Sequence, residues 1–131
     1  MKYVLWVLQV LVALFFIAAV GGRYLQPWEA VINNPMTAWA ADIPPLLLVV
    51  ISLLEVAGAI GLILPAVTGI RPELTAWAAV GLCLTMIGAA IFHITRGEIV
   101  PSVLLNLMWA AFCGFIAYGR LVLRPIPPRG A

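Results

Sequence analysis

Residues 45–65 read PLLLVVISLLEVAGAIGLILP, and this stretch decides the fold class of the chain. It is apolar from end to end apart from Ser52 and Glu55. A helix gains about 1.5 Å per residue, so roughly twenty such residues cross the ~30 Å hydrocarbon core of a bilayer. The stretch therefore predicts a transmembrane helix that carries a carboxyl group within the membrane.

Three more apolar stretches, each bounded by proline or glycine on at least one side, predict three more membrane helices. The four spans are expected at about residues 4–20, 45–66, 74–95 and 101–122. The chain of 131 residues is 65% hydrophobic and only 9% charged, whereas soluble domains carry about 25% charged residues. We expect a single all-α transmembrane domain, a membrane four-helix bundle in contact with the lipid bilayer. The net charge of +2 gives no reason to expect a nucleic-acid partner.

Lysine and arginine are unevenly divided between the two sides of the predicted bundle. The side with both termini and the second loop carries Lys2, Arg71, Arg120, Arg124 and Arg129, and the other side carries Arg23 and Arg96. Cytoplasmic segments of membrane proteins carry the excess of positive charge. We therefore expect both termini in the cytoplasm, with the protein in the cell membrane, or in the inner membrane if the cell is bacterial.

The connection over residues 21–43 is the one long loop between the predicted spans. Its apolar residues recur at helical spacing: Trp28, Val31, Ile32, Met36 and Trp39. Pro27 and the Asn34-Pro35 pair are typical of helix starts. We expect one or two short amphipathic helices on the outer membrane surface, which either anchor the bundle or cover a ligand cavity. Asp42, shortly before the second span, is expected to cap that helix.

Glu55 is the most informative single residue, because it lies near the middle of the second span. A carboxyl group that faces lipid is costly, so Glu55 should face the interior of the bundle. Ser52 precedes it by three positions and shares its helix face. Two readings stay open: a ligand-binding or proton-exchanging acid, and a partner in an interhelical hydrogen bond that holds the bundle together.

Other polar residues gather in the outer half of the predicted bundle. His93 lies one turn from the outer end of the third span, and Asn106 lies about one and a half turns into the fourth. A polar track can run from the outer loop through His93 and Asn106 down to Glu55, which shares its helix face with Ser52, and Arg23 lies at the mouth of the first span. These five are the candidate ligand-binding residues, although a lone histidine at a helix end is often only a hydrogen-bonding residue.

The metal-ligand inventory is small. The chain has one histidine, and its two cysteines, Cys83 and Cys113, lie inside apolar runs. A histidine site would need a second ligand of suitable type, and a disulfide framework would need more cysteines in loops. We expect neither a metal site nor a disulfide.

Several motifs of this sequence resemble those of one family of membrane proteins. The stretch LEVAGAIGL at residues 54–62 and the turn TGIRPELT at residues 68–75 resemble the second helix and following turn of DoxX-like proteins. The rest of the family pattern is matched by FH at residues 92–93, RGE at residues 96–98 and Asn106. The resemblance covers most of the chain after the first third and implies a four-helix membrane bundle.

The first third differs from the family pattern. Such proteins often carry a Gly-x-x-Lys-Leu element after the first helix, whereas this chain reads Gly22-Arg23-Tyr24-Leu25. Arginine keeps the positive charge of lysine but not its chemistry, so a role that needs a neutral amine is not expected here. The polar positions that the resemblance carries over are Glu55, His93 and Asn106, which the residues themselves had already singled out.

Three functions are compatible with these observations. Relatives have been linked to membrane redox complexes, including thiosulfate–quinone oxidoreduction, so the resemblance implies an accessory or binding subunit with an outer-leaflet cavity for a quinone or lipid-like ligand. The alternative is a purely structural subunit that packs against other membrane subunits or against copies of itself. The third is a small proton-coupled enzyme or transporter that uses Glu55. Enzymatic activity is left open.

Overall fold

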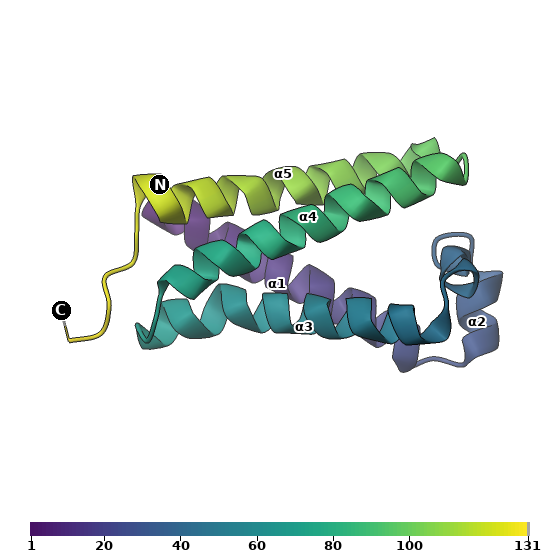
Figure 1. Ribbon diagram of the computed structural model, residues 1–131, viewed down its shortest axis with the longest axis horizontal. Helices are drawn as coiled ribbons and strands as arrows, with labels where there is room; N and C mark the ends of the chain where they lie inside the picture. Colours follow the sequence, from purple (N-terminus) through teal and green to yellow (C-terminus); the bar gives the residue numbers. More distant parts are fainter. Residues whose placement is uncertain (131) are drawn as a thin grey trace.

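The computed structural model describes residues 1–130, and these form helices joined by short connections, with no strand among them. The four long helical segments are α1 (Lys2–Tyr24), α3 (Pro45–Thr68), α4 (Glu73–Thr95) and the run of η2 (Ile99–Val103), α5 (Leu104–Tyr118) and η3 (Gly119–Leu123), which is kinked at Val100. Two short helices, α2 (Trp28–Asn33) and η1 (Ala38–Asp42), lie between α1 and α3. Figure 1 shows their arrangement.

All four long segments are long and apolar enough to cross a membrane, with mean hydropathies of 1.9 to 2.6 over their most apolar windows. Only 22% to 33% of the residues in those windows are buried within the protein, so most of each helix surface is left for lipid. The predicted fold class, an all-α four-helix membrane bundle with a short outer-loop helix, is confirmed. The protein is a multi-pass membrane protein.

Two helices extend beyond the predicted spans. α1 continues through Gly21 and Gly22 to Tyr24, because a backbone in lipid keeps its hydrogen bonds by staying helical. α3 contains Pro65 and continues to Thr68, where Gly69 ends it with a left-handed φ of 70°. The extension of α1 places Arg23, one of the candidate ligand-binding residues, in the last turn of the helix.

Asp42 does not cap α3, so that prediction is wrong. The N-cap residue of α3 is Pro44, and no side chain bonds to the orphan N–H groups of this helix. Asp42 is instead the last residue of η1, and its carboxylate pairs with Arg96 at the end of α4. The predicted second helix start at Asn34 is also displaced: Asn34 begins a turn, and η1 starts only at Ala38.

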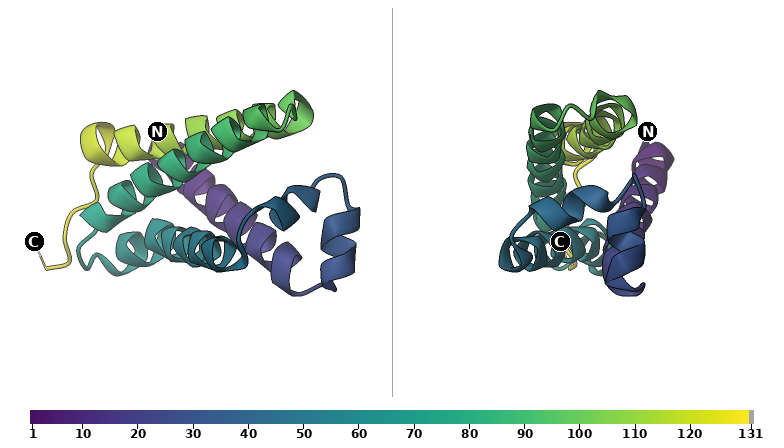
Figure 2. Two further views of the ribbon diagram at one scale, coloured as in Figure 1. Left: turned by 45° about the vertical axis from the view of Figure 1, so that its right-hand side comes forward. Right: turned by 90° about the vertical axis from the view of Figure 1, so that its right-hand side faces the viewer.

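The helices pack as two pairs that spread apart toward one end. α4 and α5 run side by side, while α1 crosses from α5 at one end of the bundle to α3 at the other (Figures 1 and 2). Both chain termini lie at the end where the pairs are close, which we name the inner end. α2 and η1 lie across the opposite, outer end, and we name residues 25–44 the outer cap.

Each long helix buries one stripe of residues at spacings of three and four, which is the packing stripe of a helix bundle. On α3 the stripe consists of Leu48, Ser52, Glu55, Ala59, Leu62 and Ala66. On α1 it includes Leu5, Gln9, Val12, Phe16 and Arg23. The apolar members form the main core, and the polar members of each stripe are carried into the interior with them.

The outer cap has a small core of its own. Val31 of α2 and Ala40 of η1 pack on Leu48 of α3, with Trp39 and Ile43 against them. Val31 and Ala40 are almost completely buried. The cap is therefore fixed on α3, and it holds Trp39 over the space between the two helix pairs.

Glycines allow α3 and α4 to approach closely. A Cβ atom built on Gly61 would lie 2.8 Å from the Cβ of Ala78, which is closer than two such atoms can approach. Gly81 of α4 has no atom within 4 Å of the same position. Small residues at helix contacts have this role in membranes, where lipid supplies no hydrophobic force between helices.

We predict that Gly61→Ala destabilises the bundle by about 1–3 kcal/mol, the usual cost of overpacking a tight contact. The same substitution at Gly81 is the control, and it should leave stability unchanged or raise it slightly, because alanine favours helix. Thermal unfolding of the detergent-solubilised variants, followed by circular dichroism, measures both. Equal melting temperatures for the two variants would contradict the close approach of α3 and α4.

Candidate functional site

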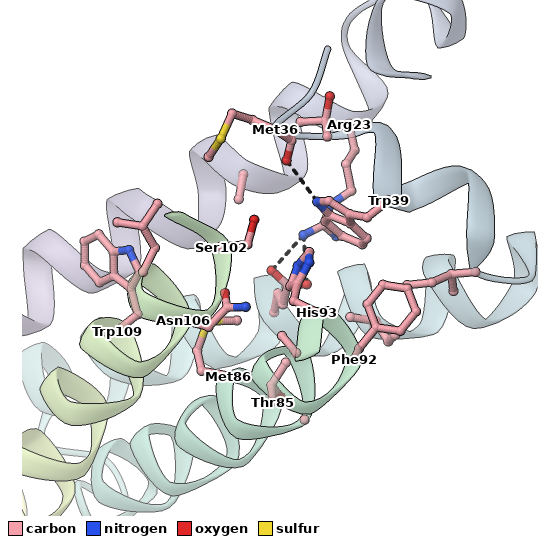
Figure 3. A pocket seen from close by; sticks show the side chains of 18 of the residues that line it. Arg23, Met36, Trp39, Thr85, Met86, Phe92, His93, Ser102, Asn106 and Trp109 are labelled. Atoms are coloured by element: carbon pink, nitrogen blue, oxygen red, sulfur yellow. Dashed lines mark hydrogen bonds and ion pairs between the residues drawn. The ribbon is translucent and has the colours of Figure 1, made fainter. Parts of the chain in front are cut away.

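A cavity of about 740 Å³ occupies the outer half of the bundle, between the two helix pairs and beneath the outer cap. Ligand pockets in proteins are typically about 300–1,000 Å³, so this cavity is large enough for a small organic molecule. Its walls come from all four long segments, and Trp39 and its neighbours in the outer cap form its roof (Figure 3). The lining is mostly apolar, with a few polar side chains.

The cavity reaches the lipid-facing surface of the bundle. Leu47 of α3 and Leu105 of α5 both line it, and they are 49% and 38% exposed. A residue that lines a cavity and also faces outward marks its rim. Both residues lie on membrane-spanning helices, where the apolar lining of the cavity is partly exposed.

Arg23 and Glu55 form a buried ion pair on the wall made by α1 and α3. Nη2 of Arg23 lies 3.0 Å and 3.1 Å from the two carboxylate oxygens of Glu55, and Nη1 donates to the Ser52 hydroxyl at 2.7 Å. The side chains of Arg23 and Glu55 are only 7% and 3% exposed. The pair neutralises both charges within the membrane, where an unpaired charge is costly.

An aromatic ring closes over this ion pair. The guanidinium of Arg23 lies 5.3 Å from the centre of the Trp39 ring, a cation–π contact. Trp39 also meets His93 edge-on, with ring centres 5.6 Å apart, and its indole N–H donates to the Met36 carbonyl at 3.0 Å. The roof is therefore tied to the ion pair on one side and to α4 on the other.

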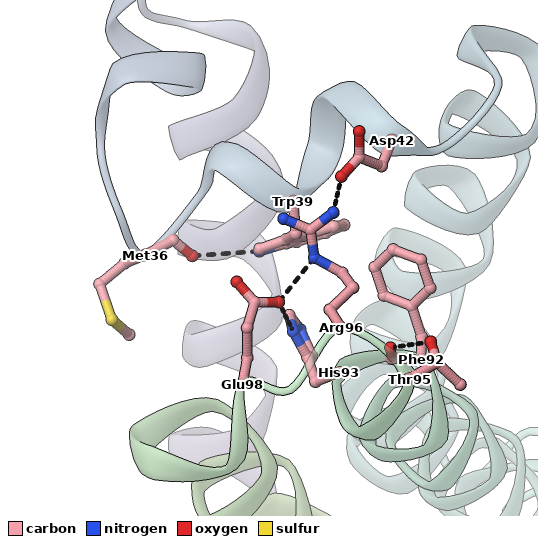
Figure 4. A network of polar contacts seen from close by, with 8 residues as sticks. All are labelled: Met36, Trp39, Asp42, Phe92, His93, Thr95, Arg96 and Glu98. Atoms are coloured by element: carbon pink, nitrogen blue, oxygen red, sulfur yellow. Dashed lines mark hydrogen bonds and ion pairs between the residues drawn. The ribbon is translucent and has the colours of Figure 1, made fainter.

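A second polar network links the outer cap to the end of α4 (Figure 4). Arg96 pairs with Asp42 of η1 and donates from Nε to Oε1 of Glu98 at 2.7 Å. The same Glu98 oxygen lies 2.9 Å from Nδ1 of His93. The hydrogen bond from Arg96, and then that from His93, hold the pKa of Glu98 below its usual value, so Glu98 is a carboxylate at neutral pH.

Asn106 lies on the wall formed by α4 and α5, on the same side of the cavity as His93 (Figure 3). Its amide nitrogen Nδ2 is buried and has no hydrogen-bond partner among residues 1–130. Buried polar atoms of folded proteins are almost always hydrogen-bonded. An unused donor at the wall of a cavity is a position where a ligand oxygen can bind.

The floor of the cavity is aromatic. Phe15 of α1 and Trp109 of α5 stack with ring centres 4.0 Å apart and bridge the two helix pairs. Both rings line the cavity. The two helix pairs stay close together on the inner side of this aromatic contact and spread apart on its outer side.

Four of the five predicted site residues line this cavity: Arg23, Glu55, His93 and Asn106. The fifth, Ser52, does not line it, but accepts a hydrogen bond from Arg23 behind the wall. The Arg96–Glu98 pair is half-buried and belongs to the network that reaches Asp42 and His93. No group of three or more potential metal-binding side chains occurs in the part of the chain that the structure describes.

Sequence reasoning did not find a second buried polar cluster, at the inner end. Arg120, counted among the flanking charges, is only 7% exposed, and its Nε donates to the side-chain oxygen Oε1 of Gln9 at 2.6 Å. The Gln9 amide in turn donates to the Leu62 backbone carbonyl at 2.7 Å. The single polar residue of the first span was the available signal, since Gln9 needs a partner if it is not to face lipid.

We predict that Arg23→Met costs about 3–5 kcal/mol of stability, because it leaves the Glu55 carboxylate buried without a partner. The double variant Arg23→Met/Glu55→Leu should recover most of that loss, since it removes both charges. The control is Arg71→Met, which breaks an ion pair whose side chains are 72% and 50% exposed and should cost about 1 kcal/mol or less. Thermal unfolding of the four proteins measures these effects. The assignment fails if Arg23→Met is no more damaging than Arg71→Met.

Comparison with known proteins agrees with the architecture. Residues 7–116 match the model of the DoxX-like family, whereas searches of curated proteins and of solved structures found no match. The matched segment begins in α1 and ends in α5, and it contains the ion pair, the polar wall and the aromatic floor described above. Since this segment takes in most of the chain, the protein belongs to the DoxX-like family.

Proposed function

We propose that this membrane protein binds, in the cavity beneath its outer cap, an amphiphilic molecule that is dissolved in the bilayer. The observation that carries the proposal is a mostly apolar cavity of about 740 Å³ with a lipid-facing rim and an unused polar atom on its wall. A ligand with a flat polar head and an apolar tail, such as a quinone or a lipid-like molecule, has the matching chemistry.

The polar residues divide into two roles. Asn106 and His93 supply the atoms that bind the head of the ligand, because Nδ2 of Asn106 has no partner and Nε2 of His93 makes no hydrogen bond within the described residues. Arg23, Glu55 and Ser52 are engaged with one another, so their role is to hold the wall formed by α1 and α3. The rings of Trp39 and Trp109 enclose the head from above and below.

An accessory subunit of a membrane redox complex is the cellular role that this binding site suits best. A protein that holds a quinone at the outer half of the bilayer can deliver it to, or collect it from, a neighbouring redox subunit. The many apolar side chains on the outer surfaces of α1, α3, α4 and α5 leave room for such a neighbour as well as for lipid.

The same apolar outer surfaces favour a second candidate, a structural subunit with no ligand of its own. Copurification with a larger complex from native membranes, combined with no saturable ligand binding, would support it. A proton-coupled transporter ranks last, because the Glu55 carboxylate is held by both hydrogen bonds from Arg23.

The charge distribution supports a cytoplasmic inner end. The inner end carries Lys2, Arg71, Arg120, Arg124 and Arg129, and its acidic residue is Glu73. At the outer end, Arg23 and Arg96 are each paired with a carboxylate. By the excess of lysine and arginine, both termini are in the cytoplasm and the cavity is in the outer half of the cell membrane, the inner membrane if the cell is bacterial.

We predict that a reporter protein that folds only in the cytoplasm is active when it is fused to the C-terminus. A reporter that requires the exterior, fused at the same residue, should be inactive. The same two reporters, fused after Gln26 in the outer cap, are the internal control. There the cytoplasmic reporter should be inactive and the exterior reporter active. The reversed result would place the cavity in the cytoplasmic half of the membrane.

We predict that decylbenzoquinone quenches the tryptophan fluorescence of the purified protein in a saturable manner, because Trp39 and Trp109 both line the cavity. Ala19 also lines the cavity, so Ala19→Phe fills part of it and should weaken binding about tenfold or more. Its neighbour Ala18 is exposed on the outside of α1, and Ala18→Phe is the matched control with unchanged binding.

Non-saturable quenching of the wild-type protein would contradict the proposed binding of an amphiphilic ligand. Equal quenching curves for Ala19→Phe and Ala18→Phe would show that the quinone binds elsewhere on the protein. Circular dichroism and gel filtration of both variants confirm that they are folded, so that a loss of binding reports on the cavity.

A further inference from the structure

The two walls of the cavity differ in the polar atoms that they leave free. On the wall of α1 and α3, the Glu55 carboxylate accepts two hydrogen bonds from Arg23, and Arg23 donates a third to Ser52. On the wall of α4 and α5, Nδ2 of Asn106 and Nε2 of His93 have no partner within residues 1–130. A ligand therefore finds its hydrogen bonds on the second wall.

The contact between His93 and Glu98 decides which ring nitrogen carries the proton. Glu98 is a carboxylate, held so by Arg96, and a carboxylate can only accept hydrogen bonds. Nδ1 of His93, 2.9 Å from Glu98 Oε1, must therefore be the N–H donor. In the neutral imidazole the other nitrogen, Nε2, then has a lone pair and accepts.

Asn106 offers the opposite chemistry on the same wall. Its unpartnered Nδ2 is a donor, and Figure 3 shows its amide nitrogen turned toward the side of the cavity where His93 lies. One acceptor and one donor thus belong to the same wall of the cavity. A hydroxyl group satisfies both, because its O–H donates to Nε2 while its oxygen accepts from Nδ2.

A carbonyl group satisfies only half of this arrangement. Its oxygen can accept from Asn106, but it has no hydrogen to give and would place a lone pair against that of His93 Nε2. Aromatic rings surround the position, since Trp39 and Phe92 both lie within 5.6 Å of the His93 ring centre. A planar head that carries its hydroxyl on an aromatic ring fits these surroundings better than an aliphatic alcohol.

We infer that the cavity selects amphiphiles with a phenolic hydroxyl head over the same molecules without an O–H donor. For a quinone-type ligand this means that the reduced, hydroxyl-bearing form is held more tightly than the carbonyl form. The inference rests on the proposed function, because it assigns the selectivity of that same cavity. His93 and Asn106 are the residues that determine it, with Glu98 and Arg96 as positioning residues behind His93.

The test uses two probes that differ by one hydrogen-bond donor, para-hexylphenol and para-hexylanisole, titrated calorimetrically into the wild-type protein in detergent. The phenol should bind about tenfold more tightly or better, since each tenfold corresponds to about 1.4 kcal/mol, the worth of a good hydrogen bond. The variants His93→Phe and Asn106→Leu should each lower this ratio toward one. Ala18→Phe, on the outside of α1, should keep it.

The outcomes separate this inference from the proposed function. Saturable binding of both probes with equal affinity overturns the selectivity and leaves the binding function standing. No saturable binding of either probe, or of decylbenzoquinone, overturns both. Tighter binding of the anisole would also overturn the selectivity, because it would mean that the wall of α4 and α5 does not favour a hydroxyl donor.

A measurement on the unmodified chain keeps the inference testable if the variants do not fold. The chain has a single histidine, so nitrogen NMR of an isotope-labelled sample reports on His93 alone. The spectrum should show the tautomer with the proton on Nδ1, and the Nε2 resonance should move when the phenol is added but not when the anisole is added. A proton on Nε2 in the free protein, or an Nε2 resonance that the phenol does not move, would falsify the inference.

Discussion

The ion pair between Arg23 and Glu55 is the interaction on which the outer half of the protein depends. Two opposite charges buried in a membrane helix bundle must neutralise each other, and only a contact between α1 and α3 allows that here. The pair fixes the outer end of α1 beside α3, and Trp39 of the outer cap lies against the Arg23 guanidinium. With α1 held there, the space between it and α5 is left as a cavity.

The cavity is consistent with the way membrane proteins use polar groups. Polar residues within spans are costly, and they persist where they are paired or where they meet a ligand. Here the paired groups Arg23 and Glu55 and the unpaired amide of Asn106 lie on opposite walls of the cavity. The charged Glu55 is engaged with Arg23, whereas Asn106, a neutral residue, has the free atom.

The sequence was sufficient to predict the helices and to place His93 and Asn106 in the outer half of the bundle, with Glu55 nearer the middle, because hydropathy and helix rise determine both. Arg23 was placed at the mouth of the first span, but its partner was not identified. The spacing of seven residues from Gln9 to Phe16 and again to Arg23 puts all three on one helix face. That spacing identifies a face, whereas the partner depends on how two helices cross. For the same reason the sequence could not predict the contacts of Arg120 with Gln9 and of Asp42 with Arg96.

The inner polar cluster has a mechanical consequence. Gln9 ties α1 to the Leu62 carbonyl of α3 and, through Arg120, to the end of the fourth segment, so the helices are joined at one level near the inner end. At the outer end the ion pair joins α1 only to α3, and the α4–α5 pair is joined to the rest through Arg96 and the cap. The two helix pairs are therefore held close together at the inner end and lie further apart at the outer end, on either side of the cavity. Any separation of the two helix pairs at the outer end must therefore act on the contact between Arg96 and Asp42, whereas the hydrogen bonds of Gln9 hold the inner end.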